Sequence, residues 1–248
     1  MQKNQRVALI TGAARRIGAA IATSLHAQGF NVIVHYHQSQ AAATSLCADL
    51  NNQRSDSAVA IAADLTVSTA LAPLVAAAVA VWGRLDVLIN NAARFYRTPI
   101  GDTERSAWDD LINSNLTAPY FLMQAAAPHL ARQQGCVINL ADVHGQRPMK
   151  DYAVYCISKA GLIMLTQAGA KELAPHVRVN AIALGPTVPA EGFNEISATV
   201  AAKIMNRTPL KRVGDAADVT QAVEFLVQSA NYITGQVLAV DGGRSLTI

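Results

Sequence analysis

The stretch RVALITGAARRIG, residues 6–18, is the most informative part of the chain about its fold. The five residues that follow Arg6 are apolar or β-branched, which is typical of a buried strand. A turn with glycine, TGAARRIG, follows at once, and apolar residues then recur at helical spacing from Ile17 to Leu25. A strand, a tight turn and a helix in this order predict the first unit of a parallel α/β sheet.

The same alternation continues to the other end of the chain. We expect further strands at residues 31–36, 58–62, 86–89, 136–140, 177–182 and 236–240. We expect helices at residues 41–50, 68–81 and 216–228, one that ends near Arg132 and one that ends at Leu173. This pattern predicts an α/β protein with a single-domain Rossmann fold, a doubly wound parallel sheet of about seven strands over residues 1–248. An irregular stretch at about 185–208 is expected to be a substrate-binding insert, because long inserts are usually functional.

The composition argues against several classes of protein. The 248 residues are 51% hydrophobic and 15% charged, which is enough for a large core. A net charge of only +3, with scattered basic residues, makes a nucleic-acid partner unexpected. Cys47, Cys136 and Cys156 are odd in number and lack CxxC spacing, so neither a disulfide framework nor a metal site is expected. The apolar runs are too short for a membrane helix or signal peptide, and we expect a cytoplasmic protein.

The turn at residues 11–18 is the predicted phosphate-binding loop. Its glycines stand only at 12 and 18, which departs from GxGxxG. Its place between the first strand and the first helix would nevertheless bring backbone N–H groups to a pyrophosphate, and Arg15 and Arg16 add positive charge. The alternative is an ordinary turn with solvated arginines.

The end of the second strand bears on which dinucleotide is bound. A site for NAD usually has a carboxylate here, whereas this chain reads HYHQS at residues 35–39. His35, His37 and Ser39 would offer donors to a 2′-phosphate, which favours NADP, and a solvated loop is the alternative. Asp64, after the third strand, could accept a hydrogen bond from an adenine amine or cap the next helix.

The segment DVHGQRPMKDYAVYCISK, residues 142–159, carries the candidate catalytic groups. If its second half is helical, Tyr155 and Lys159 lie one turn apart on one face. A nearby ammonium would lower the pKa of the phenol from its usual value toward the working pH. Tyr155 is therefore the candidate general acid.

Three motifs in order, TGAARRIG, NNAA at 90–93 and YCISK, resemble the short-chain dehydrogenase/reductase family along the whole chain. The resemblance implies that Asn90 braces the sheet and that Asn115 joins Tyr155 and Lys159 in a catalytic group. It also implies a homotetramer, with Thr187 at the nicotinamide carboxamide. The residues expected to bind NADPH or NADP are Gly12, Arg15, Arg16, Ile17, Gly18, Tyr36, His37, Ser39, Asp64, Leu65, Asn91, Ala92, Tyr155, Lys159, Gly185 and Thr187.

Asp142 departs from this family, which commonly has Ser thirteen residues before the catalytic Tyr. A hydroxyl can donate to a carbonyl oxygen, whereas an ionised carboxylate only accepts and would repel the negative charge that grows there. Asp142 therefore argues against simple ketone reduction. It suits a substrate with N–H groups, or one whose ring nitrogen is protonated while a C=N bond is reduced. A loop aspartate in an Asx turn is the alternative.

Several segments resemble one branch of the family, the pteridine reductases: TGAARRIG, HYHQS, NNAARFYRTP, Asp142, and YITGQVLAVDGG with RSLT. The resemblance implies a pterin between the nicotinamide and the ring of Phe95. The substrate-binding residues would be Arg16, Phe95, Asp142 and Tyr155, although Phe95 could instead be plain core. The departures from the branch are Gln38 in place of Arg, Ala93 and Arg94 where serines can stand, and Leu184 in place of the Pro of NxxxPG.

The expected function is NADPH-dependent reduction of a pterin, with hydride passed from nicotinamide to a C=N carbon and a proton from Tyr155. Lys159 would hold the nicotinamide ribose, and Asn115 would support a proton relay. One alternative is a carbonyl reductase acting on 3-oxoacyl thioesters. The other is a noncatalytic NADPH sensor, which would need no proton donor.

Overall fold

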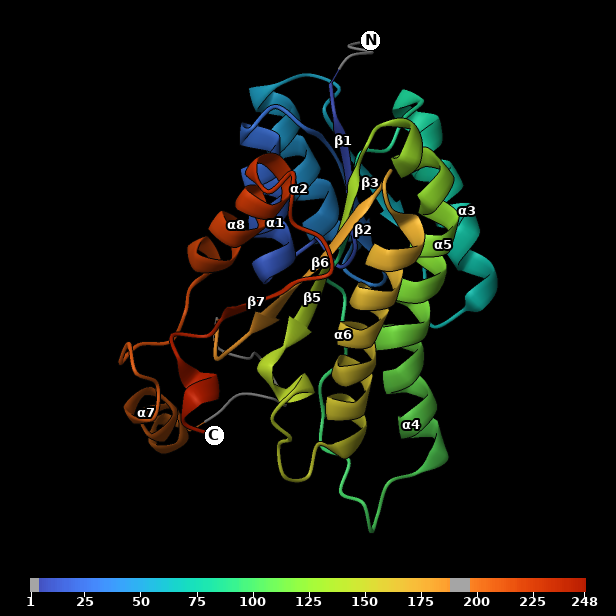
Figure 1. Ribbon diagram of the computed structural model, residues 1–248. Helices are drawn as coiled ribbons and strands as arrows, with labels where there is room; N and C mark the ends of the chain where they lie inside the picture. Colours follow the sequence, from blue (N-terminus) through green and yellow to red (C-terminus); the bar gives the residue numbers. More distant parts are fainter. Residues whose placement is uncertain (1–4, 188–196) are drawn as a thin grey trace.

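The computed structural model describes residues 5–187 and 197–248, and its centre is one parallel sheet (Figure 1). The strands lie in the order β3-β2-β1-β4-β5-β6-β7, and every neighbouring pair is parallel. Their bounds are Val7–Ile10 (β1), Asn31–Tyr36 (β2), Ala58–Ala62 (β3), Val87–Asn90 (β4), Cys136–Asp142 (β5), Arg178–Leu184 (β6) and Val237–Val240 (β7). The doubly wound parallel sheet predicted from the sequence is confirmed.

Helices cover both faces of the sheet. They are Arg16–Ala27 (α1), Gln40–Gln53 (α2), Ser68–Trp82 (α3), Arg105–Ile112 (α4), Ala118–Arg132 (α5), Ala153–Leu173 (α6), Ala198–Asn206 (α7) and Ala216–Glu224 (α8). Helices α1, α2 and α8 lie on one side, and α3, α5 and α6 lie on the other (Figure 1). Among the described residues, no helix combines the length and the apolar character needed to cross a bilayer.

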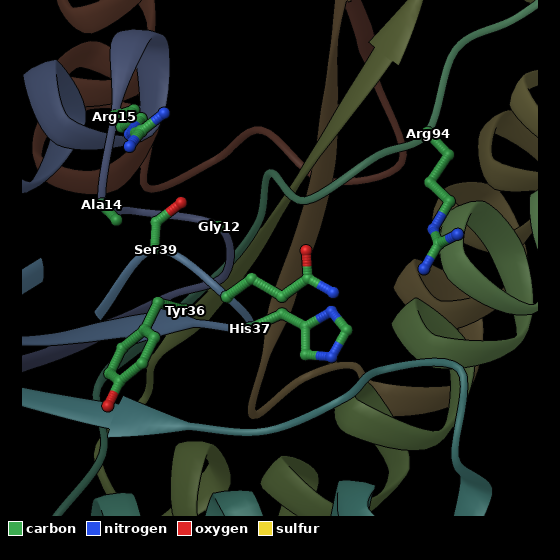
Figure 2. A pocket seen from close by; sticks show the side chains of 8 residues that line it. Gly12, Ala14, Arg15, Tyr36, His37, Ser39 and Arg94 are labelled. Carbon is green, nitrogen blue, oxygen red and sulfur yellow. The ribbon is translucent and has the colours of Figure 1, made fainter. Parts of the chain in front are cut away.

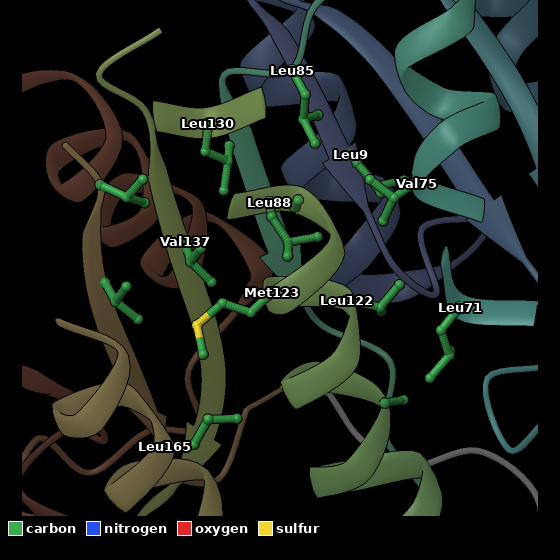
Figure 3. Close-up of a cluster of buried hydrophobic side chains, with 14 of the residues drawn as sticks. Leu9, Leu71, Val75, Leu85, Leu88, Leu122, Met123, Leu130, Val137 and Leu165 are labelled. Carbon is green, nitrogen blue, oxygen red and sulfur yellow. The ribbon is translucent and has the colours of Figure 1, made fainter. Parts of the chain in front are cut away.

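The two hydrophobic cores follow from the alternation of side chains along each strand. Val7 and Leu9 of β1 join the cluster under α3, α5 and α6, whereas Ala8 and Ile10 join the cluster under α1, α2 and α8. Figure 3 shows Leu9 of the first cluster beside Val75 of α3, with Leu88 and Val137 on neighbouring strands. Because both faces of these strands are buried, the strands read as continuous apolar runs.

The strand order places a crevice at one end of the sheet. The chain moves outward from β1 to β3 and then returns to place β4 on the other side of β1. The connections after β1 and β4 therefore lead to helices on opposite faces of the sheet, and open α/β sheets bind their ligands beside such a point, at the carboxyl ends of the strands. The segments that carry the predicted phosphate loop and the NNAA motif both end in this crevice.

The stretch at 185–208 differs from the sequence prediction. Part of it is helical, because α7 begins after Ser197, whose side chain accepts a hydrogen bond from the Val200 amide at 3.3 Å. Serine is a favoured N-cap, and the Ala-rich helix that follows has high helix propensity. Residues 188–196 of the predicted insert lie outside the described residues.

Candidate active site

The phosphate loop is shaped by close backbone approaches. Gly12 has a φ of +61°, a conformation that glycine adopts at little cost, and α1 starts four residues later. A Cβ on Gly18 would lie 2.6 Å from Asn91 Nδ2, so only a glycine lets α1 lie this close to the segment after β4. The side-chain amide of Asn91 donates to the carbonyl oxygens of Thr11 and Gly12, at 2.8 and 3.1 Å. The loop and the NNAA segment thus form one rigid unit.

His35 has a different role from the one predicted. Its ring is 2% exposed, its Nδ1 accepts a hydrogen bond from the Gly12 amide at 3.1 Å, and its Nε2 lies 3.1 Å from the Ala63 carbonyl oxygen. Burial lowers the pKa of this imidazole to about 4, so it is neutral, with its proton on Nε2. A buried ring with both nitrogens bonded cannot serve as a donor to a 2′-phosphate. The prediction for His35 was therefore wrong.

A cavity of about 420 Å³ opens above the phosphate loop, and Figure 2 shows its lining. It is lined by Gly12, Ala14, Arg15, Tyr36, His37, Gln38, Ser39 and Arg94. The structure thus brings together Gly12, Arg15, Tyr36, His37 and Ser39, five of the residues predicted to bind NADP. Glycine backbone, an arginine and a serine beside a helix N-terminus fit the diphosphate of a dinucleotide. Sequence reasoning noted Arg94 only as a departure from the branch, and its contribution to this cavity was missed.

Asp64 and Leu65 follow β3 on the adenine side of the predicted site. Asp64 Oδ1 accepts from the Thr66 amide at 2.9 Å and from the Thr66 hydroxyl at 2.7 Å, and these bonds lower the pKa of the carboxyl. Its Oδ2 lies 3.6 Å from His37 Nε2. Asp64 therefore closes a local turn at Thr66, and the expectation that it caps the next helix was wrong, because the N-cap of α3 is Val67. Its contact with an adenine stays a prediction, and Leu65 is buried in the core.

Asn90 braces the sheet, as the family resemblance implied. Its side-chain amide donates to Asn139 Oδ1 at 2.8 Å, and the amide of Asn139 donates to the Thr166 hydroxyl at 2.9 Å. Thr166 in turn donates to the Leu162 carbonyl oxygen at 2.8 Å. Buried side chains on β4, β5 and α6 are therefore joined by one line of hydrogen bonds.

The central contact of the site joins Asp142 to Tyr155. Asp142 is the last residue of β5, and Tyr155 stands in the first turn of α6. The phenol donates to Asp142 Oδ2 at 2.7 Å, while Oδ1 accepts from the His144 amide at 2.7 Å. The carboxylate thus caps the following turn with one oxygen and contacts the predicted general acid with the other. Burial and the neighbouring carboxylate raise the pKa of Tyr155 well above its ordinary value.

Lys159 does not act on Tyr155 in the way the spacing predicted. Its Nζ donates to the Leu140 carbonyl oxygen at 2.7 Å and lies 5.8 Å from the centre of the Tyr155 ring. Burial lowers the pKa of this ammonium to about 8, and Asp142 opposes that shift. The expectation that Lys159 lowers the Tyr155 pKa was wrong for this arrangement, because burial and Asp142 outweigh the more distant ammonium.

Asn115 lies in a π-helical turn, Asn113–Thr117, that joins α4 to α5. Its side chain accepts from the Arg94 amide at 2.8 Å and donates to the Arg94 carbonyl oxygen at 2.9 Å. It also donates to the Ser158 hydroxyl at 3.1 Å, next to Lys159 in α6. Asn115 therefore fixes the segment after β4 against α6. Irregular turns of this kind frequently occur at functional sites.

Phe95 lies beside Tyr155, and Arg16 is not among the described residues that line the cavity. The Phe95 ring is stacked on Tyr152, with centroids 4.8 Å apart and planes at 14°, and it meets the Tyr155 ring edge-on at 4.8 Å. A flat ligand stacked on Phe95 must therefore use the face opposite Tyr152. Arg16 is exposed and has a φ of +53° at the start of α1. Its role toward a pterin stays a prediction.

The remaining predicted residues, Ile17, Ala92, Gly185 and Thr187, hold the loops around the crevice. Ile17 packs on the core, and the Ala92 amide donates to the Thr11 hydroxyl at 3.0 Å. The Gly185 amide donates to the Val240 carbonyl oxygen at 3.0 Å, and Thr187 forms a β-bridge with Gly214. Their predicted contacts with a cofactor stay predictions.

Comparisons with known proteins agree with this arrangement. Residues 12–245 match the family model described as Enoyl-(Acyl carrier protein) reductase. The chain is 38% identical to Pteridine reductase 1 of Leishmania tarentolae, with 97% of this chain and 96% of that protein covered. It is 35% identical to 3-oxoacyl-(acyl-carrier-protein) reductase FabG of Staphylococcus aureus, with 97% and 98% covered. It is 36% identical to Granaticin polyketide synthase putative ketoacyl reductase 2 of Streptomyces violaceoruber, with 97% and 96% covered.

Reductases matched along nearly their whole length show that the chain belongs to the short-chain dehydrogenase/reductase family of oxidoreductases.

Proposed function

We propose that this protein reduces pterins or dihydropterins with NADPH, at a C=N bond. The observation that carries the proposal is the 2.7 Å hydrogen bond between the Tyr155 phenol and the Asp142 carboxylate. It places an acceptor for ring N–H groups directly beside a proton donor. The similarity to Pteridine reductase 1 supports the same substrate class.

The residues around the crevice fit a nicotinamide dinucleotide. The loop at Gly12, the helix N-terminus at Arg16 and the cavity lining are suited to its phosphates. No described carboxylate lines the cavity beside Ser39, which supports NADP as the cofactor. When bound, the cofactor supplies hydride to the substrate carbon. Lys159 and Thr187 would hold its nicotinamide end.

The proton for the ring nitrogen is assigned to Tyr155. Because the pKa of the phenol is raised by burial and by Asp142, the group is protonated at neutral pH. To reach the substrate, the O–H turns from Asp142 Oδ2 toward the ring nitrogen, and the carboxylate accepts an N–H of the pterin in its place. The carboxylate stays in position during this exchange, because its Oδ1 is held by the His144 amide.

Position and orientation of the pterin are assigned to Phe95, Asp142 and Arg16. Stacking on the Phe95 face opposite Tyr152 would place the ring edge near the Tyr155 hydroxyl. Held between the Phe95 ring and the nicotinamide, the ligand would be shielded from water.

The test is NADPH oxidation against a panel of pterins, dihydropterins and dihydrofolate. Tyr155→Phe should lower turnover by at least about a hundredfold while NADPH binding is kept, because a positioned general acid contributes on that order. Asp142→Ser should cost pterin reduction more than NADPH binding. Wild-type protein that binds NADPH but oxidises it with none of these substrates would overturn the proposal.

A 3-oxoacyl thioester reductase is the second candidate, favoured by the 35% identity to FabG over 98% of that protein. An acetoacetyl thioester assayed beside dihydrobiopterin separates the two. Under this alternative the thioester is reduced faster, and Asp142→Ser raises its rate because a hydroxyl donor replaces a repelling carboxylate.

We also propose that the chain acts as one NADP-binding domain in the cytoplasm, with residues 185–208 at the substrate site and four copies in the assembly. The three cysteines are buried free thiols, which is consistent with a reducing compartment. Large apolar side chains stay exposed on α5 and α6, which supports association through these helices.

A further inference from the structure

The feature that the proposed mechanism leaves unexplained is the position of Arg94. It follows the NNAA segment after β4, yet its side chain lines the cavity together with the phosphate loop and the end of β2. In Figure 2, Arg15 lies on the left of the view and Arg94 on the right, and the ring of His37 lies lower, between them. Two arginines thus line a cavity in which the other described lining residues carry no carboxylate.

The backbone of Arg94 is fixed from two directions. Its amide donates to Asn115 Oδ1 at 2.8 Å, and its carbonyl oxygen accepts from Asn115 Nδ2 at 2.9 Å. Because Asn115 is 1% exposed and also bonded to Ser158, this anchor is itself rigid. The backbone of Arg94, from which the side chain extends, is therefore fixed before any ligand binds.

The side chain is oriented by an ion pair on one edge. Arg94 Nη1 lies 2.5 Å from Asp110 Oδ1, and the other oxygen of Asp110 accepts from the Tyr96 hydroxyl at 2.8 Å. A guanidinium has five N–H donors arranged in a plane, so it can bind a carboxylate on one edge and an anion on another. The Arg94 side chain is also 42% exposed, so part of it stays open to solvent while it is paired with Asp110.

We propose that Arg94 binds a phosphate group of the dinucleotide, from the side of the cavity opposite the phosphate loop. In this role it supplies the positive charge that Gln38 does not provide at the end of β2. The inference rests on the proposed use of a nicotinamide dinucleotide. The oxyanion could belong to the 2′-phosphate or to the diphosphate, and both present the same chemistry to a guanidinium.

The experiment measures the Kd of NADPH and of NADH by quenching of intrinsic fluorescence. The four proteins compared are the wild type, Arg94→Ala, Arg97→Ala and Asp110→Asn. Arg94→Ala should weaken NADPH binding by about tenfold or more, because a charge-assisted hydrogen bond is lost. Arg97→Ala is the matched control. Arg97 lies in the same segment as Arg94 and also forms an ion pair, with Asp151, but it does not line the cavity. It should change the Kd less than about twofold.

Asp110→Asn separates phosphate binding from a purely structural role of the ion pair. If Arg94 binds phosphate, this variant keeps or tightens NADPH binding, because one negative charge leaves while the arginine remains. If Arg94→Ala loses affinity for NADPH alone, the arginine binds the 2′-phosphate. If it loses affinity for NADH equally, the arginine binds the diphosphate. If the alanine variant is unfolded at the assay temperature, Arg94→Gln takes its place.

Two outcomes would overturn the inference: equal affinities of Arg94→Ala and Arg97→Ala for both dinucleotides, or a loss in Asp110→Asn as large as that in Arg94→Ala. Pterin turnover is measured separately. Wild-type protein that binds NADPH without reducing pterins contradicts the proposed substrate, yet it leaves the comparison of the Arg94 variants intact.

Discussion

Asp142 serves two partners with one side chain. The sequence offered two readings of this residue, a substrate ligand and a turn-forming aspartate. The turn-forming reading is confirmed, because Oδ1 accepts from the His144 amide. The other oxygen contacts Tyr155, and its contact with a substrate stays a prediction. The bond to the His144 amide prevents the carboxylate from rotating away from Tyr155. A serine at this position has one side-chain oxygen instead of two, so a single atom would have to make both contacts.

Lys159→Met is expected to stabilise the folded protein at pH 7 while removing activity. The folded pKa of about 8 lies below the ordinary 10.5, so between these values the unfolded chain binds more protons and stability rises with pH. At neutral pH the buried ammonium therefore costs about 3 kcal/mol, and about 1 kcal/mol at pH 9.5. Urea unfolding at pH 7 and pH 9.5 measures the difference in the free energy of unfolding between the variant and the wild type.

The control for this measurement is Lys171→Met, which lies in the same helix at an exposed position. The free energy of unfolding of Lys171→Met should equal that of the wild type at both pH values. A Lys159→Met protein that is less stable than wild type at both pH values would contradict the expected cost of burying the charge.

His35 is expected to make the protein sensitive to acid. Its folded pKa of about 4 lies below the ordinary 6.5, so the unfolded chain binds more protons between these values. Stability is complete above pH 6.5 and falls by up to about 3 kcal/mol as the pH drops to 4. Unfolding of His35→Asn and wild type at pH 7 and pH 4.5 should show a weaker pH dependence for the variant. His37→Asn, at an exposed position, should keep the wild-type dependence.

At the scale of elements, the sequence predicted regular segments better than the irregular ones between them. The bounds of β2 and β3 are those predicted, because apolar runs there are bracketed by polar turns. The π-helical turn at Asn113–Thr117 and the helix α7 were not predicted. A π-helical turn depends on long-range contacts such as that of Asn115 with Arg94, which no local pattern reveals.

The same limit applies to the candidate site. Spacing brought Tyr155 and Lys159 to one face, and the position of the turn placed Gly12 in the cavity. The pKa of Lys159, the buried ring of His35 and the ion pair of Arg94 depend on neighbours far away along the chain. Burial sets these properties, and it is known only once the layers are assembled.

Asn115→Ala is expected to loosen the segment after β4 without unfolding the sheet. The variant leaves the Arg94 amide and carbonyl oxygen without their partner, at a cost of about 1 to 3 kcal/mol. Hydrogen exchange at the Arg94 amide should become faster, while exchange in β1 stays slow. Asn113→Ala, in the same turn and less buried, serves as the comparison. Unchanged protection at Arg94 would contradict the anchoring role.

At the scale of the whole molecule, the helices on one face of the sheet have an apolar surface of their own. Tyr120 and Phe121 of α5 are 47% and 41% exposed, and Ile157 and Met164 of α6 are 48% and 62% exposed. Figure 1 shows α5 and α6 side by side along the molecule. These exposed apolar groups on neighbouring helices support the proposed association through α5 and α6.

Met164→Glu combined with Phe121→Glu is expected to lower the oligomeric state, because two charges would be buried at the proposed association surface. Sedimentation velocity measures the change. Ile100→Glu, at a loop position that is 90% exposed, should leave the assembly intact. A wild-type protein that sediments as a monomer would contradict the tetramer, and a double variant that stays tetrameric would place the interface elsewhere.

The hydrogen bonds from Asn90 through Asn139 to Thr166 have a consequence for how this chain can evolve. Replacing Thr166 by Val alone would leave the Asn139 amide buried without its partner, at about 1 to 3 kcal/mol. Replacing all three residues by apolar ones of similar shape removes the buried polar groups together and can cost little. Related sequences should therefore keep all three residues or replace all three together. The three positions are expected to co-vary.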